Sequence, residues 1–236
     1  EGFWENYPPF KERGLDFYDL ANPRWFQQDP ELAWGFYGHR LHLYRETTPH
    51  AGHEMLARWG AAMPTAPFVF TSNVDGQFQK AGFADDRLLE CHGSIHHLQC
   101  ARPCDTRIWS ADATDVEVDE ETFRARGQLP SCPSCGEIAR PNVLMFGDFR
   151  WVGDRTERQK RRFADWRDGL GDATLAVVEC GAGTAVPTVR ARCEQLARRS
   201  EATLIRINPR EPEAPDDAIS IAGGALEVLS AIDEMI

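Results

Sequence analysis

Four of the chain's seven cysteines stand in two close pairs, Cys100 with Cys104 and Cys132 with Cys135. Two such pairs on tight turns supply the four thiolates of a tetrahedral zinc site and leave no coordination position open for catalysis. The stretch between them is polar and acidic, with little apolar pattern to hold it together. The alternatives are four ordinary buried thiols or disulfides, and the odd number of cysteines makes disulfides the weaker interpretation. The sequence therefore predicts one structural zinc ion.

A second set of polar residues follows the apolar run at 68–70. The loop at 71–76 contains Asn73 and Asp75, which can orient a sugar or a water molecule, and further along His92 precedes Gly93. A histidine acts as a base near neutral pH. His92 taken alone also fits a structural role, because the chain has seven histidines. Only the combination of these residues favours catalysis.

A third feature is a turn of small residues, Gly181, Ala182 and Gly183, which follows an apolar run and precedes a helix that Pro187 opens. Small residues there let backbone amides and the helix amino end approach a pyrophosphate. A tight turn without a ligand is an equal alternative. Asn208, at the end of the next apolar run, can bind a ribose hydroxyl or cap the turn that follows it.

Helices are expected in the first part of the chain. Residues 31–46 carry apolar side chains at mixed spacings of three and four, with Asp29 as N-cap and Pro30 at the first helical position. A second short helix is predicted at 53–59.

Strands are predicted at 68–70 and, after Pro141, at 143–146, 175–178 and 203–207, with segments of helical composition between them. This alternation predicts parallel pairing with right-handed crossovers. We therefore expect an α/β fold with a doubly wound parallel sheet of Rossmann type. Residues 1–98 and 137–236, including a helical part at about 5–60, would form that domain, and 99–136 would form a small inserted zinc ribbon.

The composition narrows the class of protein. A net charge of −11 argues against direct nucleic-acid binding, because it would repel a phosphate backbone. No apolar run is long enough for a bilayer, and the first residues do not read as a signal peptide. We expect a cytoplasmic protein with no membrane partner.

Taken in order, the motifs resemble those of the sirtuins, the Sir2-type NAD-dependent protein deacylases, along nearly the whole chain. The loop at 71–76 is similar to the family's Thr-Gln-Asn-Ile-Asp loop, and the cysteine pairs resemble its zinc ribbon. The other similar segments are His92-Gly93-Ser94, the Arg-Pro-x-Val and Phe-Gly-Glu segment at 140–148, the nucleotide loop at 181–186, and Ile207-Asn208.

The resemblance implies NAD as co-substrate and acylated lysine side chains of proteins as substrates. The acyl oxygen would attack the anomeric carbon of the nicotinamide ribose, and His92, as general base, would deprotonate a ribose hydroxyl so that the acyl group migrates. Backbone groups around Met145, Phe146 and Gly147 would pair with the substrate peptide as an added strand. The residues implied to hold NAD are Thr71, Ser72, Asn73, Asp75, Gly181, Ala182, Gly183 and Asn208.

Tyr37 and Arg40 have the spacing seen in sirtuins that accept acidic acyl chains. Arg40 would clamp a carboxylate, and the Tyr37 hydroxyl would add a hydrogen bond, which favours succinyl or malonyl over acetyl groups. The alternative is that both residues merely lie on the face of the predicted helix.

The chain departs from the family pattern at several points. No Gly-Ala-Gly-x-Ser loop precedes residues 2–4, so we expect an amino-terminal segment to be missing from this sequence. Ser72 stands where the family has glutamine, and Phe78 stands near its usual histidine. Two alternatives therefore stay open: a Sir2-type NAD glycohydrolase or ADP-ribosyltransferase, and a catalytically silent NAD-sensing or interaction module.

Overall fold

A computed structural model describes residues 14–199 and 201–236, so the sequence at 2–4 lies outside the described residues. The chain folds into two compact units. The first unit contains the described residues up to Thr47, together with Asn73–Gly76 and Glu90–Arg158. The second unit contains Thr48–Ser72, Gln77–Leu89 and Gln159–Ile236. The division predicted from composition, with 99–136 as a separate insertion, stays a prediction.

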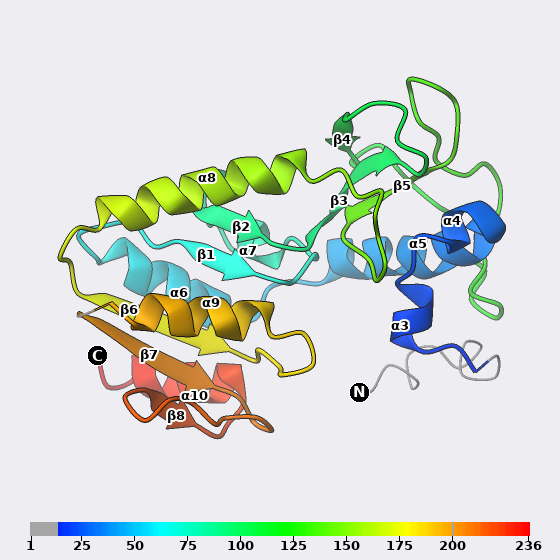
Figure 1. Ribbon diagram of the computed structural model, residues 1–236. Coiled ribbons are helices and arrows are strands. Elements are labelled where there is room, and N and C mark those ends of the chain that lie inside the picture. Colours follow the sequence, from blue (N-terminus) through cyan, green and yellow to red (C-terminus); the bar gives the residue numbers. More distant parts are fainter. Residues whose placement is uncertain (1–13, 200) are drawn as a thin grey trace. The chain divides into compact units, whose positions relative to one another are not determined.

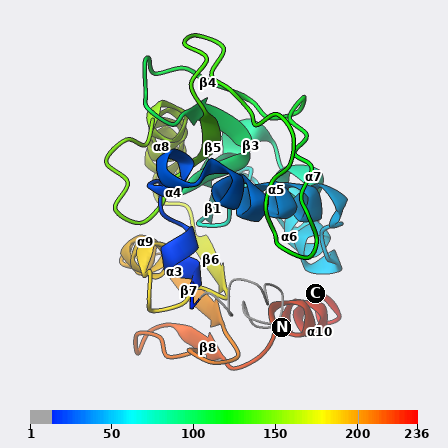
Figure 2. The same ribbon diagram turned by 90° about the vertical axis from the view of Figure 1, so that its right-hand side faces the viewer.

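The first unit is built on an antiparallel sheet in the order β4-β3-β5. Its strands are β3 (Gly93–Cys100), β4 (Ile108–Ser110) and β5 (Ala139–Val143), seen beside α5 in Figure 2. The predicted parallel strand at 143–146 is therefore wrong: the strand ends at Val143 and runs antiparallel to β3. The reason is that β5 contains two buried polar residues, Arg140 and Asn142. The strand is therefore not an apolar run, and apolar runs were the signal from which strands were predicted.

A buried polar network explains how β5 accommodates Asn142. The Asn142 Nδ2 donates to the Gln99 Oε1 at 2.9 Å and to the Val152 carbonyl at 2.8 Å. The Gln99 Oε1 also accepts from the Val152 N–H at 3.0 Å, and its Nε2 donates to the Arg150 carbonyl at 2.9 Å. Buried polar groups must find partners of this kind. The network fixes the segment that follows residues 145–148 against the sheet.

Helix α5 (Pro30–Glu46) confirms the predicted long helix, and the Asp29 side chain accepts from the Leu32 N–H as its N-cap. The helix packs on β3 and on the short helix α4 (Trp25–Gln28), and Phe17 of the short helix α3 (Phe17–Leu20) contacts its Phe36. A Cβ on Gly35 would lie 1.9 Å from the Phe123 carbonyl oxygen. This glycine therefore lets the excursion, the polar and acidic stretch between the two cysteine pairs, pack directly on the helix. Apolar residues of the excursion thereby join the core of this unit.

The second unit contains a parallel sheet in the order β6-β7-β8, visible at the lower left of Figure 1. Its strands are β6 (Leu175–Cys180), β7 (Ala202–Ile207) and β8 (Ile219–Ile221), and α9 (Thr188–Ala197) packs on the first two. The strands predicted at 175–178 and 203–207 and their parallel pairing are confirmed. The sequence interpretation missed β8.

The remaining elements complete the chain. Strand β1 (Val69–Thr71) confirms the strand predicted before the polar loop and pairs with β2 (Leu88–Glu90). Helix α6 (Ala51–Ala61) confirms the second predicted helix and contacts α10 (Ala225–Asp233). The others are α7 (Gln77–Lys80), η1 (Asp85–Arg87) and α8 (Asp154–Gly169). Within the described residues, no helix combines the length and the apolar composition needed to cross a membrane.

Candidate active site and metal centre

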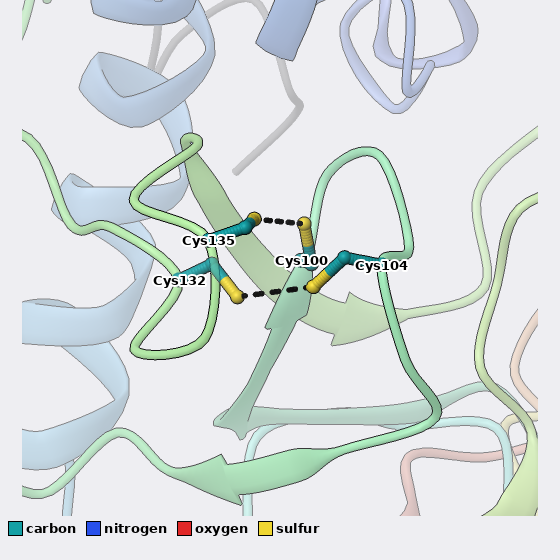
Figure 3. A group of neighbouring side chains, drawn as sticks. All are labelled: Cys100, Cys104, Cys132 and Cys135. Atoms are coloured by element: carbon teal, nitrogen blue, oxygen red, sulfur yellow. Dashed lines mark hydrogen bonds between the residues drawn. The ribbon is translucent and has the colours of Figure 1, made fainter.

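The four predicted metal ligands converge. Their Sγ atoms all lie within 4.8 Å of one another, and Figure 3 shows them pointing inward from two facing segments. The Cys100 and Cys135 sulfurs are 3.8 Å apart, and those of Cys104 and Cys132 are 3.7 Å apart. A tetrahedral zinc ion with Zn–S bonds of about 2.3 Å requires sulfur atoms about 3.8 Å apart. The side chains present therefore fit a structural zinc ion.

The thiols change one another's pKa in opposite directions. Burial raises the pKa of Cys132, but hydrogen bonds from the Ser134 and Cys135 backbone outweigh it and lower this pKa to about 7. The hydrogen bond with Cys135 raises the pKa of Cys104 to about 12. Four thiolates so close together repel one another, and a bound divalent cation offsets that charge.

His92 lies in the turn between β2 and β3 and is half-buried. Gly93 has a φ of +80°, and a Cβ there would lie 2.0 Å from the Asn142 carbonyl oxygen. Only glycine fits this position, because both the backbone conformation and the close approach to β5 exclude a side chain. The His92 carbonyl also accepts from the Leu144 N–H at 2.9 Å. The backbone of His92 is thus fixed on both sides.

The loop that carries Asn73 and Asp75 is fixed to the same strand. The Ile95 N–H donates to the Val74 carbonyl at 2.9 Å. The His96 Nε2 lies 2.8 Å from the Asp75 carbonyl, which can only accept, so Nε2 carries the proton. Asn73 is exposed and Asp75 half-buried. The structure therefore attaches the predicted catalytic residues to the beginning of one strand.

A buried ion pair supports the predicted substrate segment. Arg140 Nη1 lies 2.7 Å from Asp148 Oδ2, and both side chains are fully buried. The same carboxylate accepts from the Met145 N–H at 3.4 Å. The Phe146 N–H donates to the Ala21 carbonyl at 2.9 Å. Met145 and Phe146 are thus positioned from β5 on one side and from the end of α3 on the other.

Tyr37 and Arg40 lie on α5 in different surroundings. Tyr37 is buried among core residues, and burial raises its pKa above its ordinary range. Arg40 is half-buried and donates to the hydroxyl of Tyr44. The sequence interpretation had assigned Tyr44 no role. Tyr44 is four residues after Arg40 on the same helix, and this spacing could have predicted their contact.

The predicted nucleotide turn follows β6 in the second unit. Gly181 has a φ of +67°, and its N–H donates to the Ile207 carbonyl at 2.9 Å. Asn208 is buried: its Nδ2 donates to the Ala182 carbonyl at 3.0 Å, and its Oδ1 accepts from the backbone N–H groups of Arg210 and Glu211, each at 3.0 Å. The Asn208 side chain therefore links the ends of β6 and β7.

Two further residues shape this turn and were not singled out from the sequence. Arg190 on α9 is buried and donates to the carbonyls of Ala182 at 3.1 Å, Glu211 at 2.9 Å and Glu213 at 2.7 Å. The Glu211 carboxylate accepts from the Thr184 hydroxyl at 2.5 Å and from its N–H at 3.0 Å, and these hydrogen bonds lower its pKa. A basic residue on the buried face of a predicted helix was the signal for Arg190.

The sequence model of the Sir2 family matches residues 1–160. The chain belongs to the Sir2 family. It is 30% identical to an NAD-dependent protein deacylase of Thermus thermophilus over 98% of this chain and 80% of that protein. It is 31% identical to NAD-dependent protein deacylase 2 of Pyrobaculum aerophilum over 100% of this chain and 82% of that protein.

Solved structures of Sir2 homologues resemble this chain in fold. A mutant Sir2 homologue in complex with ADP-ribose is 25% identical, with a TM-score of 0.67 over 100% of this chain and 82% of that one. A Sir2 homologue–NAD complex, 23% identical, has a TM-score of 0.65 over 96% of this chain and 84% of that one. The predicted α/β fold class is confirmed.

Two departures from the Sir2 motifs have a place in the structure. Thr71 and Ser72 are half-buried at the end of β1. Phe78, near the family's usual histidine, packs its ring 5.0 Å from His53 and 5.4 Å from Phe83. Phe78 is therefore part of an aromatic cluster in the second unit, where its apolar ring suits the surroundings.

Proposed function

We propose that this protein removes acyl groups from lysine side chains in a reaction that consumes NAD and releases nicotinamide and O-acyl-ADP-ribose. The observation that carries the proposal is the position of His92, next to a glycine that no other residue can replace and at the start of the strand that binds the Asp75 loop. Relatives 30% and 31% identical over nearly the whole chain are named NAD-dependent protein deacylases.

In this proposal His92 is the general base. NAD, when bound, supplies an electrophilic ribose carbon to the acyl oxygen and a ribose hydroxyl that takes the acyl group. His92, which is half-buried, accepts the proton of that hydroxyl, and histidine is the side chain that most often acts as a general base. Asn73 and Asp75 hold the ribose and a water molecule. Because the loop is tied to β3, these groups keep their positions relative to His92.

The remaining nucleotide contacts in this proposal are polar and local. The turn at Gly181, Ala182 and Gly183 precedes α9, whose amino end favours a phosphate group. Asn208 supports this turn through its hydrogen bond to Ala182. In this proposal its remaining amide N–H contacts a ribose hydroxyl. Thr71 and Ser72 are the remaining residues that we propose to contact NAD.

The substrate peptide pairs with Met145, Phe146 and Gly147 as an added strand. Gly147 has a φ of +65° and no atom within 4 Å of a Cβ built on it, so the backbone turns there in open space. The buried Arg140–Asp148 pair keeps the preceding residues rigid. In this proposal the zinc ion is structural and holds the 99–136 insertion.

We test the proposal by nicotinamide release from NAD, using the full-length protein with no peptide, with acetyl-lysine peptide and with succinyl-lysine peptide. His92→Ala is expected to lose about 10²- to 10⁴-fold in rate, the usual contribution of a general base. His42→Ala is the matched control, because His42 is exposed and paired with Asp115 at 2.8 Å.

The same assay separates the alternatives. Release that depends on acylated peptide and is lost only in His92→Ala supports the deacylase. Peptide-independent release would replace it by a NAD glycohydrolase or ADP-ribosyltransferase. NAD binding without release would replace it by a silent sensor.

The acyl group in this proposal carries a carboxylate. Arg40 is half-buried, and no carboxylate among the described residues lies within ion-pair distance of it. A guanidinium presents five N–H donors, so most remain for a ligand. Succinyl or malonyl chains supply the missing anion.

A further inference from the structure

Strand β3 bulges where it passes the proline of β5. The ladder goes from the pair Ser94–Asn142 directly to the pair Leu98–Pro141, so the three residues of β3 between these pairs have no partner on β5. Proline has no N–H to donate to a neighbouring strand, and prolines within sheets are found at such bulges. A bulge bends the strand and changes the direction of the side chains it carries. The bulged residues are Ile95, His96 and His97.

The bulge attaches β3 to the loop that carries Asn73 and Asp75. The Ile95 N–H donates to the Val74 carbonyl at 2.9 Å, and the His96 Nε2 donates to the Asp75 carbonyl at 2.8 Å. These two carbonyls belong to the peptide groups on either side of the Asp75 Cα. Because each peptide group is planar, fixing both of them also fixes the direction in which the Asp75 side chain leaves the backbone.

The two hydrogen bonds differ in what they require of the sequence. Any residue but proline at position 95 supplies a main-chain N–H, whereas the second bond needs a side-chain donor at position 96. Gly76 makes room for this donor: its φ is +72°, and a Cβ there would lie 2.8 Å from the His96 Cδ2 and 2.9 Å from its Nε2. A larger residue at 76 would displace the imidazole from the Asp75 carbonyl. His96 and Gly76 therefore form one contact.

We propose that His96 is a positioning residue for the reaction. Its Nε2–H holds the Asp75 carbonyl and so keeps the loop at 73–76 in place relative to His92. This inference rests on the proposed function, in which Asn73 and Asp75 hold the ribose and a water molecule. His92 directly precedes β3 and His96 lies within it. One strand therefore carries both the proposed base and the side chain that aligns the other groups with it.

The geometry distinguishes this role from that of a second base. The Asp75 carbonyl can only accept, so the His96 nitrogen that faces it carries a proton and has no lone pair for proton transfer. Neutral imidazole with its proton on Nε2 and the imidazolium ion both donate from this atom. The contact therefore holds in either charge state of His96. A glutamine, whose amide nitrogen is also a donor, can take its place.

The test measures NAD affinity by isothermal titration calorimetry, and kcat and KM for NAD and for acetyl-lysine peptide. His96→Phe keeps a ring and removes the donor. We expect NAD affinity to fall about 10-fold, as the loss of one hydrogen bond does, and kcat to fall about 100-fold, as a displacement of about 1 Å does. The KM for the peptide should not change, because the substrate segment is not perturbed.

Two variants serve as matched controls. His96→Gln restores a donor without restoring a base, so it should recover most of both losses. His97→Gln is the same change at the next residue, whose Nδ1 has no hydrogen-bond partner among the described residues. It should keep the wild-type values for NAD.

Gly76→Ala tests the same contact from the side of the loop. Its Cβ should displace the His96 ring, so kcat should fall as it does in His96→Phe. The double variant Gly76→Ala with His96→Ala should lose less in kcat than the product of the two single losses, because both changes break one contact. Losses that multiply would show that the two residues act separately and would overturn the inference.

The remaining outcomes also decide the inference. An NMR spectrum of protein labelled with isotopic nitrogen at histidine should show a slowly exchanging proton on the His96 Nε2, and an unprotonated Nε2 would overturn the inference whatever the variants do. So would wild-type kinetics in His96→Phe, or a His96→Gln as impaired as His96→Phe. If NAD affinity falls in His96→Phe and returns in His96→Gln while the wild type turns over no acyl-lysine peptide, the contact stands and the proposed function falls. Unchanged circular dichroism and melting temperature show that each variant folds.

Discussion

The buried pair formed by Arg140 and Asp148 gives the sharpest test of how the substrate segment is held. Asp148→Asn keeps the shape of the side chain and removes its charge. The carboxylate accepts from Arg140 Nη2 at 3.0 Å and from the Arg150 N–H at 3.1 Å through Oδ1, and contacts Arg140 Nη1 at 2.7 Å through Oδ2. The Arg140 Nε has no hydrogen-bond partner among the described residues. The carboxylate is therefore the main compensation for this guanidinium.

Breaking a fully buried pair at one partner typically costs about 3–5 kcal/mol, because an uncompensated charge stays in a low-dielectric interior. For a chain of this size that corresponds to a fall in melting temperature of roughly 6–20 °C. The measurement is thermal unfolding followed by circular dichroism. Peptide-dependent nicotinamide release should fall more than NAD binding does, since the perturbed segment contacts the peptide in the proposed function.

The double variant Arg140→Met with Asp148→Leu is the control. Removing both charges avoids the uncompensated ion, so the double variant should be more stable than Asp148→Asn alone. A loss below about 1 kcal/mol in Asp148→Asn, or a double variant as unstable as the sum of its single changes, would refute the reasoning.

Three further predictions follow from other parts of the chain. Gly93→Ala should lower the free energy of unfolding by about 3 kcal/mol or more, because its Cβ would lie 2.0 Å from a backbone oxygen. The control is Gly82→Ala, at a φ of +90° with no atom within 4 Å of the added Cβ. It should lower the free energy of unfolding, measured by urea unfolding, by only about 1 kcal/mol. Burial, and after it the charge of Arg155, lowers the pKa of His97 to about 4. As the pH falls, the unfolded chain binds the proton before the folded chain does, so the free energy of unfolding should fall by about 2 kcal/mol from pH 6.5 to 4. His97→Gln should reduce this pH dependence, measured as the melting temperature at each pH. Purified protein should contain about one zinc per chain by elemental analysis, and chelation or Cys104→Ser should lower the melting temperature; zinc-free protein with unchanged melting would contradict the metal site.

The elements that could be predicted are those whose signal is local. Helix α5 begins at Pro30 behind Asp29, where a side-chain cap and a fixed φ act at neighbouring residues. Strands β6 and β7 are apolar runs of a parallel sheet. The metal site was predictable for the same reason, because the two cysteines of each pair lie on one turn and their spacing is visible in the sequence. Only the approach of the two turns to each other depends on the fold.

The choice between Tyr37 and Tyr44 shows where local signals end. On a helix, residues three before and four after Arg40 are both its neighbours, so spacing alone does not decide which hydroxyl it meets. The decision comes from packing: Phe26 on α4 and Phe36 draw the Tyr37 ring into the core, and the ring of Tyr44 remains beside the guanidinium. That information lies in α3 and α4, which sequence spacing along α5 does not contain.

Two features that were not predicted from the sequence, strand β5 and the role of Arg190, have a buried arginine in common. Two of the proposed ligand-binding segments are each held by a buried arginine on a neighbouring element: Arg140 on β5 holds the segment at 145–148, and Arg190 on α9 holds the turn at Ala182. A buried guanidinium offers several donors in a fixed plane, so one side chain fixes backbone atoms from separate segments. Such residues interrupt the apolar pattern of the strand or helix that carries them, which is why β5 was not recognised. Arg140 and Arg190 each mark a supported loop next to the element that carries them.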